Sequence, residues 1–446
     1  MNNMNNLLDK FLEFEKKEQL FKYNQNGHSI WPFLRLEVYR FLTMDKNGDA
    51  YLPVYKRQVL NNSFSNENYN TLCKLSSNKD VLLFTSKHRL LPSFSGLICP
   101  HEEMLKTTGL NYYRINLLFD ENKAHDAHDL CFKSSDNDKF FDLINDKIAS
   151  KILNLIIEEF DIDRLDNFVI RYNSMVQYIC DLSKQYYGLK QFLSETKPKI
   201  IALSSAYSIP GIFITLAAHE LDIKVVEFQH GLIDCSHIAY NSLCTDINKN
   251  YYPDCLFTYG VFDCCFPRHI IPKVIAIGNY YLEMCKKRYY KSKSNIILIV
   301  DDIDNPELIF KLAYRLYKAK INDKFEVIYR LHPESPLPKN KINDLEKINI
   351  RISYNDENIY ELLSKSKWVV GIRSTVLIEA LYFECNSRTL ENENVNNIAF
   401  KLLKKVNCSQ LINEVNQNIN IDETNISNLF YTKFNSSSLL EQLEML

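Results

Sequence analysis

The feature that most constrains the fold is a regular alternation of short apolar segments and helical segments from about residue 197 to residue 390. The stretches "KPKIIALSS", "IPGIFITLAAHEL" and "KVVEF" follow one another and indicate a strand, a helix and a second strand. The same order continues in "NIILIVDD", "NPELIFKLAYRLYKAK" and "FEVIYRLHP". Because the crossover between two such strands is right-handed, the alternation predicts parallel sheets with helices on both faces.

The chain of 446 residues is long enough for two domains of ordinary size. We expect an α/β fold with two facing Rossmann-like domains and a helical N-terminal segment. The expected units are the helical N-terminal segment at 1–78, one Rossmann-like domain at 79–270, a second at 271–395, and C-terminal helices at 396–446. The border between the domains is expected where "NKNYYPD" and the basic "KKRYYKSKS" interrupt the alternation.

Composition argues against some classes of partner and site. A net charge of -2 gives no general attraction to nucleic acid, so we expect no nucleic-acid partner. The 12 cysteines form no C-x-x-C pair, which favours reduced thiols and no metal site. A zinc site that includes His230 or His237 is the alternative, although its ligand spacing would be unusual.

The N-terminus has no signal-peptide pattern, and no apolar run approaches the roughly eighteen residues of a membrane span. We therefore expect a cytoplasmic protein. The first forty residues indicate two amphipathic helices, which we expect to pack on their own domain. A membrane surface is the alternative location for them.

Polar residues stand at the ends of several predicted strands. In an open parallel sheet, ligands bind outside the carboxyl ends of the strands, so these residues are candidates for a binding site on topological grounds. The main clusters are Gln229, His230 and Gly231; His332 and Pro333; and Arg373, Ser374 and Thr375. Ser204, Ser205 and Asp301 end further predicted strands and are additional candidates.

The cluster in "GIRSTVLIEAL" suits an anionic ligand. Ser374 and Thr375 stand where a strand stops and a helix begins, and the free N–H groups at such a point bind anions. Arg373 could add a positive charge. Glu379 follows Thr375 by about one helical turn and could accept a hydrogen bond from a ribose hydroxyl. The alternative is structural, with Ser374 acting only as a helix cap and Glu379 as a solvated or capping carboxylate.

The two histidines suit different roles. His332 could bind a phosphate oxygen, or hydrogen-bond to a base or a leaving group, although a histidine in a loop is often structural. His230 could act as a general base, because imidazole titrates near neutral pH. Gly231 beside it would leave room for a substrate. The alternative for His230 is a buried side chain in a tight turn.

The motifs at these strand ends resemble those of known transferases. "HGLID" resembles the His-Gly motif of the CDP-glycerol glycerophosphotransferases of teichoic acid synthesis. "RLHP" followed by "RSTVLIEAL" resembles the His-Pro and Ser-Ser/Thr motifs of bacterial sialyl- and polysialyltransferases. The chain thus resembles bacterial surface-polysaccharide glycosyltransferases of the GT-B architecture, over roughly residues 200–390. The resemblance implies that 79–270 is the acceptor domain and 271–395 the nucleotide-donor domain.

The resemblance also implies roles for individual residues. His332 would contact the donor phosphate or nucleotide, Ser374 and Thr375 would bind the donor phosphate, Glu379 would hold the ribose, and His230 would be the base.

The sialyltransferases carry an acidic motif as base in the first domain, and we find no counterpart there. Asp301 and Asp302 are paired acids, but they lie in the second domain. This leaves the base, and sialic acid as the donor sugar, open.

The implied function is transfer of a sugar, or of glycerophosphate, from a nucleotide-activated donor to a glycan hydroxyl in capsule or other surface-polysaccharide synthesis. The donor would be CMP- or CDP-linked, and the reaction would need no metal or other cofactor. The acceptor could be lipid-linked, with peripheral contact at the inner face of the bacterial membrane. The alternatives are a nucleotide-sugar epimerase or hydrolase on the same fold, and a non-enzymatic protein with a degenerate transferase fold.

Overall fold

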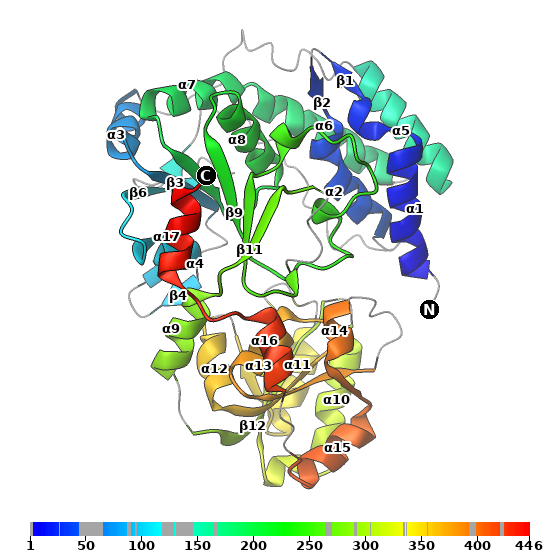
Figure 1. Cartoon of the computed structure of the whole chain (residues 1–446). Helices are drawn as coiled ribbons and strands as arrows, with labels where there is room; N and C mark the ends of the chain where they lie inside the picture. The colour runs from blue at the N-terminus through cyan, green and yellow to red at the C-terminus, as the bar shows by residue number, and fades with distance from the viewer. Residues whose placement is uncertain are drawn as a thin grey trace.

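The computed structural model describes residues 3–25, 27–43, 66–86, 91–93, 96–117, 129–130, 146–163, 167–263, 270–289, 292–303, 305–332, 335, 337–354, 356–391, 398–419 and 423–446. The described chain forms two lobes, each built around one parallel β-sheet (Figure 1).

The sheet of the first lobe has seven strands in the order β11-β10-β9-β8-β3-β6-β7, and all neighbours are parallel. The strand order reverses between β3 and β8, and such a reversal opens a crevice at the carboxyl ends of the strands. The strands are β3 (Val81–Ser86), β6 (Tyr112–Leu117), β7 (Asp129–Leu130), β8 (Ile200–Leu203), β9 (Lys224–Phe228), β10 (Cys255–Thr258) and β11 (Lys273–Ala276).

The sheet of the second lobe has six strands in the order β14-β13-β12-β15-β16-β17, again all parallel. This is the order of a Rossmann fold, with its reversal between β12 and β15. The strands are β12 (Ser294–Val300), β13 (Glu326–Arg330), β14 (Arg351–Ser353), β15 (Ser366–Gly371), β16 (Asn386–Leu390) and β17 (Lys404–Val406).

The prediction of an α/β fold with two facing Rossmann-like domains is confirmed by this topology. The strands form from nearly continuous aliphatic runs because helices cover both faces of a parallel sheet. In β12, for example, Ile297, Leu298 and Ile299 are all fully buried.

Two strands lie beyond the expected domain limits. β11 starts after residue 270 and still pairs with β10 of the first sheet, so that sheet extends to Ala276. β17 starts after residue 395, in the segment expected to be helical, and pairs with β16.

Helices cover both faces of the first sheet (Figure 1). The N-terminal helices belong to this lobe: Phe11 and Phe14 of α1 and Trp31 of α2 are buried in its main apolar core. The expectation that these helices pack on their own domain is therefore met. The helices are α1 (Asn3–Lys17), α2 (Trp31–Thr43), α3 (Asn66–Ser76), α4 (Pro100–Lys106), α5 (Asp146–Phe160), α6 (Asn167–Ser183), α7 (Tyr186–Thr196) and α8 (Ile209–His219).

The helices of the second half begin with α9, directly after β11. Their bounds are α9 (Tyr280–Tyr289), α10 (Pro306–Lys318), α11 (Lys339–Lys347), α12 (Ile359–Lys365), α13 (Thr375–Tyr382), α14 (Ile398–Leu402), α15 (Cys408–Asn416), α16 (Thr424–Phe430) and α17 (Ser436–Glu444). No helix within the described ranges combines the length and the apolar character that a membrane crossing requires.

The C-terminal segment joins the two lobes. α16 lies on the second lobe where it faces the first, whereas α17 returns to the first lobe (Figure 1). Leu439 and Leu443 of α17 are buried in one apolar cluster with Phe228 of β9. Gly260, which follows β10, lies so close to the backbone of Phe430 that an added Cβ would be 2.3 Å from the Phe430 carbonyl. Both lobes therefore meet directly beneath the ends of β9 and β10.

Candidate active site

A cavity of about 240 Å³ lies between the two lobes, at the carboxyl ends of the first sheet. Its walls combine loops that follow β9, β10 and β11 with the N-terminal parts of α4, α9, α12 and α13 and the C-terminal end of α16. The described residues that line it are Pro100, His101, Gln229, His230, Gly231, Leu232, Tyr259, Asp263, Asn279, Tyr281, Tyr360, Thr375, Ile378, Glu379, Phe430 and Tyr431. Five candidates from the sequence are among them: Gln229, His230, Gly231, Thr375 and Glu379.

The second-lobe wall is the start of α13. Ser374 caps this helix, because its hydroxyl accepts a hydrogen bond from the Val376 N–H at 3.3 Å. Thr375 follows on the cavity surface, and Glu379 lies one turn deeper. The Tyr360 hydroxyl donates to Glu379 Oε1 at 3.3 Å. Burial raises the pKa of Glu379 to about 7, so near neutral pH this carboxyl can either accept or donate a hydrogen bond.

The first-lobe wall contains His230, which follows β9. Its Nε2 atom lies 2.6 Å from the hydroxyl of Tyr207. The Tyr207 ring also contacts the rings of His237 and Tyr240, at centroid distances of 5.2 and 5.5 Å. Tyr240 in turn donates its hydroxyl hydrogen to Glu227 of β9 at 2.8 Å. His230 is thus oriented by an aromatic cluster behind it. Burial lowers the pKa of His237 to about 4, so that histidine is neutral at pH 7.

Gln229 is buried and fixes the loop in front of His230. Its side-chain nitrogen donates to the Gly231 carbonyl at 2.7 Å, and its side-chain oxygen accepts from the Tyr259 N–H at 2.6 Å. The Gln229 main-chain N–H bonds to the Phe257 carbonyl of β10. Gln229 therefore joins the ends of β9 and β10, which supports a positioning role.

His101 at the start of α4 lines the cavity and was not predicted. It is buried, and its ring stacks on Phe228 at a centroid distance of 5.4 Å. Its Nε2 atom lies 2.9 Å from the Gln229 carbonyl oxygen and must carry a hydrogen, because a carbonyl only accepts. In the neutral ring, Nδ1 then accepts from the Ser204 hydroxyl at 2.7 Å. Ser204, a predicted candidate, thus stands behind His101 and does not line the cavity.

Asp263 is another cavity residue that the sequence did not predict. It lies five residues beyond the end of β10 and is 1% exposed. Its Oδ1 accepts a hydrogen bond from the Ile233 N–H at 2.9 Å. Burial raises the pKa of Asp263 to about 7. The other candidates were predicted because they directly follow a strand. Asp263 was not, because four residues separate it from the end of β10.

His332 lies at the end of β13, in a second polar cluster that does not line the cavity. The centre of this cluster is Asp301, which accepts hydrogen bonds from Tyr329 at 2.8 Å and from Ser335. The His332 main-chain N–H lies 3.5 Å from the same carboxylate. Burial lowers the pKa of His332, although Asp301 and Asp302 partly oppose this effect. Asp301 therefore has a structural role in shaping the His332 loop.

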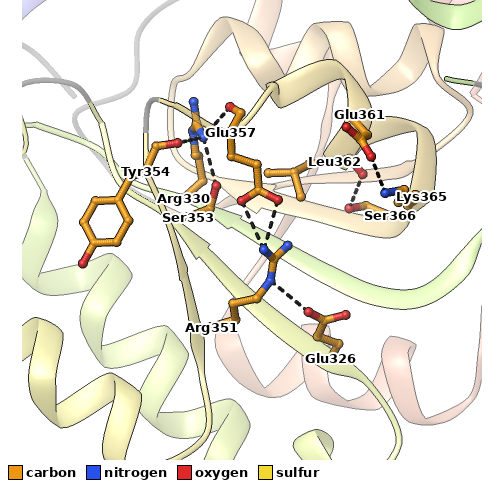
Figure 2. Close-up of polar contacts among 10 residues, drawn as sticks. All are labelled: Glu326, Arg330, Arg351, Ser353, Tyr354, Glu357, Glu361, Leu362, Lys365 and Ser366. Atoms are coloured by element: carbon orange, nitrogen blue, oxygen red, sulfur yellow. Dashed lines mark hydrogen bonds and ion pairs between the residues drawn. The ribbon is translucent and has the colours of Figure 1, made fainter. Parts of the chain in front are cut away.

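Arg330, two residues before His332, connects this strand end to the end of β14 (Figure 2). Its guanidinium donates to the Ser353 hydroxyl and to the Glu357 carbonyl, both at 2.9 Å. Arg351 of β14 pairs with Glu357 at 3.0 Å and with Glu326 at 2.9 Å. The ends of β13 and β14 are thereby tied to the turn before α12.

Arg373 and Ser205 also do not line the cavity. Arg373 Nε is 3.4 Å from Asp302 Oδ2, so this arginine faces the end of β12. The Ser205 carbonyl accepts the hydroxyl hydrogen of Ser208, the cap of α8, at 2.8 Å. Pro333 lies outside the described residues.

The described residues include no cluster of three or more His, Cys, Asp or Glu side chains that could hold a metal ion. The sequence does contain an Asp-x-Asp pattern after β12, at Asp302 and Asp304. Asp304 lies outside the described residues, and Asp302 is engaged by Asn305 at 3.0 Å and by Arg373.

No protein-family model matches the sequence, and no curated protein matches it either. The UDP-GlcNAc 2-epimerase from Neisseria meningitidis, bound to UDP-GlcNAc, is a similar solved structure, with 14% identity and a TM-score of 0.48 over 82% of this chain and 99% of that chain. The UDP-GlcNAc 2-epimerase from Methanocaldococcus jannaschii has 11% identity and a TM-score of 0.49, and the match covers 82% of this chain and 99% of that chain. MurG from Acinetobacter baumannii has 12% identity and a TM-score of 0.43, and the match covers 82% of this chain and 100% of that chain. Values this low do not establish a shared activity.

Proposed function

We propose that the chain is a transferase that moves a sugar, or glycerophosphate, from a nucleotide-activated donor to an acceptor hydroxyl. One observation carries the proposal: His230 of the first lobe lines the same cavity as Thr375 and Glu379 of the second lobe. A transfer reaction needs a donor and an acceptor to meet in a site from which water is excluded. A cavity between two lobes suits that need, because two lobes can close around their ligands.

The donor is proposed to bind on the second lobe. When the bond between the transferred group and the nucleotide phosphate breaks, negative charge develops on the phosphate. The first turn of α13 offers the Thr375 hydroxyl at the positive end of the helix dipole, and both stabilise such charge. Glu379 is proposed to hold the ribose, as the sequence predicts. This arrangement stabilises the leaving group without requiring a metal ion.

The acceptor is proposed to enter from the first lobe, where the hydroxyl proton would be taken up on the His230 side of the cavity; the motif resemblance gives His230 itself as the base. The finer proposals concern the biological setting: a bacterial enzyme of capsule or other surface-polysaccharide synthesis, with a CMP- or CDP-linked donor and a lipid-linked glycan acceptor at the inner face of the membrane. They rest on the motifs in 225–234 and 325–381, not on the cavity.

The proposal is tested by measuring the melting temperature of the protein with CMP, CDP, UDP, GDP and dTDP, each with and without magnesium. A ligand that binds the native state raises the melting temperature by mass action. We expect one nucleotide class to stabilise the wild type without magnesium, and Glu379→Ala to remove that effect. Glu361→Ala is the matched control, because Glu361 lies on the neighbouring helix α12 and does not line the cavity. A folded protein that responds to no nucleotide would contradict the proposal.

A further inference from the structure

Asp263 belongs to the first lobe but lies at the point where the lobes touch. The preceding residue, Phe262, donates its main-chain N–H to the Leu429 carbonyl at 2.9 Å. The Phe262 ring packs on Phe430 at a centroid distance of 4.6 Å. Because Phe430 lines the cavity beside Asp263, the position of this carboxyl depends on the contact between the lobes.

Two contacts hold the Asp263 side chain on the loop that carries His230. The Ile233 N–H donates to Oδ1 at 2.9 Å, and the Gln229 side chain also donates a hydrogen bond to this carboxyl. Asp263 and His230 therefore face the cavity from one rigid unit that joins the ends of β9 and β10. A carboxyl fixed in this way meets the requirement that a general base be held at a defined distance from the substrate.

The surroundings of Asp263 favour proton uptake. Burial disfavours its charged form, and the nearby carboxyl of Asp234 adds repulsion, whereas the Ile233 and Gln229 hydrogen bonds act in the opposite direction. Tyr431 of the second lobe interacts electrostatically with Asp263, and Glu379 faces the same cavity from α13. His230 and His101 complete the titratable groups of the first-lobe wall. The result is a pKa of about 7 for Asp263, which is suited to a general base near neutral pH.

We propose that Asp263 is the residue that takes the proton from the acceptor hydroxyl. This inference rests on the proposed transferase function. The acceptor oxygen forms a bond to the donor carbon or phosphorus, the bond from that atom to the nucleotide phosphate oxygen breaks, and its electron pair leaves with the nucleotide. The hydroxyl proton passes to an Asp263 carboxylate oxygen. His230, the base that the resemblance implies, has its Nε2 atom engaged by the Tyr207 hydroxyl at 2.6 Å and is assigned instead to orienting the acceptor.

The test compares Asp263→Asn with Asp234→Asn. Both are isosteric changes of buried carboxyls, and an asparagine oxygen can still accept from Ile233 or from Ser236, the partner of Asp234. Asp234 does not line the cavity, so it is the matched control. The rate of nucleotide release from CMP-sialic acid, CDP-glycerol and UDP-N-acetylglucosamine is measured between pH 5 and 9 with a pool of oligosaccharide acceptors.

We expect the wild-type rate to rise with pH to a plateau above about pH 7. Asp263→Asn should lower the plateau roughly 100- to 10,000-fold and remove the rise, with nucleotide affinity unchanged. Asp234→Asn should keep the plateau and the rise, with the rise moved to lower pH because a negative charge near Asp263 is lost. Retention of the rate and of the pH rise in Asp263→Asn would overturn the assignment of the base but leave the transferase function standing. A wild type that binds no nucleotide and releases none would overturn the function itself.

A second measurement does not depend on turnover. The carboxyl carbon signals of protein labelled with ¹³C-aspartate are followed from pH 3 to pH 9, and the signal that is missing in Asp263→Asn is assigned to Asp263. Titration close to pH 7 supports the assignment, whereas titration near the ordinary value of about 4 would overturn it.

Discussion

The hydroxyl of Tyr207 lies 2.6 Å from Nε2 of His230, and this contact fixes the orientation of the less buried of the two histidines that line the cavity. Tyr207 belongs to the turn between β8 and α8, so the two residues come from different strand ends of one sheet. The contact shows how a parallel sheet assembles a site from segments that lie apart in sequence.

Replacing Tyr207 by Phe should therefore loosen His230 without unfolding the lobe. The ring contacts with His237 and Tyr240 remain, and only the hydroxyl is lost. We expect KM for the acceptor to rise roughly ten-fold, because a positioning contact is typically worth 1 to 2 kcal/mol, with the melting temperature little changed. Tyr187→Phe, at an exposed position on α7, is the control. A Tyr207→Phe enzyme with wild-type kinetics would show that this contact does not position the substrate.

Glu379 should make stability depend on pH. Its pKa is about 7 in the folded chain and near 4.3 when unfolded. Between these values the native state keeps a proton that the unfolded state has released, so the free energy of unfolding falls as pH rises from about 4 to 7. Glu379→Gln has no ionisable carboxyl at this position, so its free energy of unfolding should not show this fall between pH 4 and pH 7. Urea denaturation at pH 5 and pH 8 should show the variant gaining stability relative to wild type at pH 8, and an equal difference at both values would contradict the buried carboxyl.

Gly260 should be essential for the contact between the lobes. A Cβ at this position would lie 2.3 Å from the Phe430 carbonyl, and the atoms it meets are backbone atoms that cannot move aside easily. Gly260→Ala should cost about 1 to 3 kcal/mol in calorimetric unfolding. Gly231→Ala is the control, because no atom lies within 4 Å of a Cβ built there. If both variants melt at the same temperature, the lobes do not meet as described.

The buried pair of Glu15 and Arg35 should stabilise the loop behind the site. Arg35 bonds to Glu15 at 2.7 Å and donates to the carbonyls of Ile238 and Asn241, which frame Tyr240 of the aromatic cluster. Arg35→Ala leaves a buried carboxylate without its cation and should cost about 3 to 5 kcal/mol in urea denaturation. Lys17→Ala, which breaks an exposed pair with Glu159, should lower stability far less than Arg35→Ala does. An equal loss of stability in Arg35→Ala and Lys17→Ala would show that the buried pair does not stabilise this loop.

The sequence predicted the sheets because their strands are continuous aliphatic runs separated by amphipathic helices. It also predicted His230, Thr375 and Glu379 on the cavity, because residues at the carboxyl ends of parallel strands converge on one edge of each sheet. His332 also lies at a strand end, yet hydrogen bonding around Asp301 keeps it in a separate cluster.

His101 and Asp263, which the sequence did not predict, are brought to the cavity by tertiary contacts. His101 comes from the first turn of α4, and its hydrogen bonds join it to Ser204 and Gln229, more than a hundred residues away. Asp263 comes from a loop that is folded against α16, and its burial depends on contacts between the lobes. Neither tertiary contact leaves a local pattern in the sequence.

The measurement that tests the central claim most directly is whether consumption of the donor depends on an acceptor. The protein is incubated in D₂O with the nucleotide sugar whose nucleotide stabilises it most, with and without oligosaccharides, and the products are analysed by mass spectrometry. The transferase proposal predicts nucleotide release and a glycan longer by one unit, only when the acceptor is present. Conversion of the nucleotide sugar alone to an isomer that carries deuterium would contradict it and would identify an epimerase.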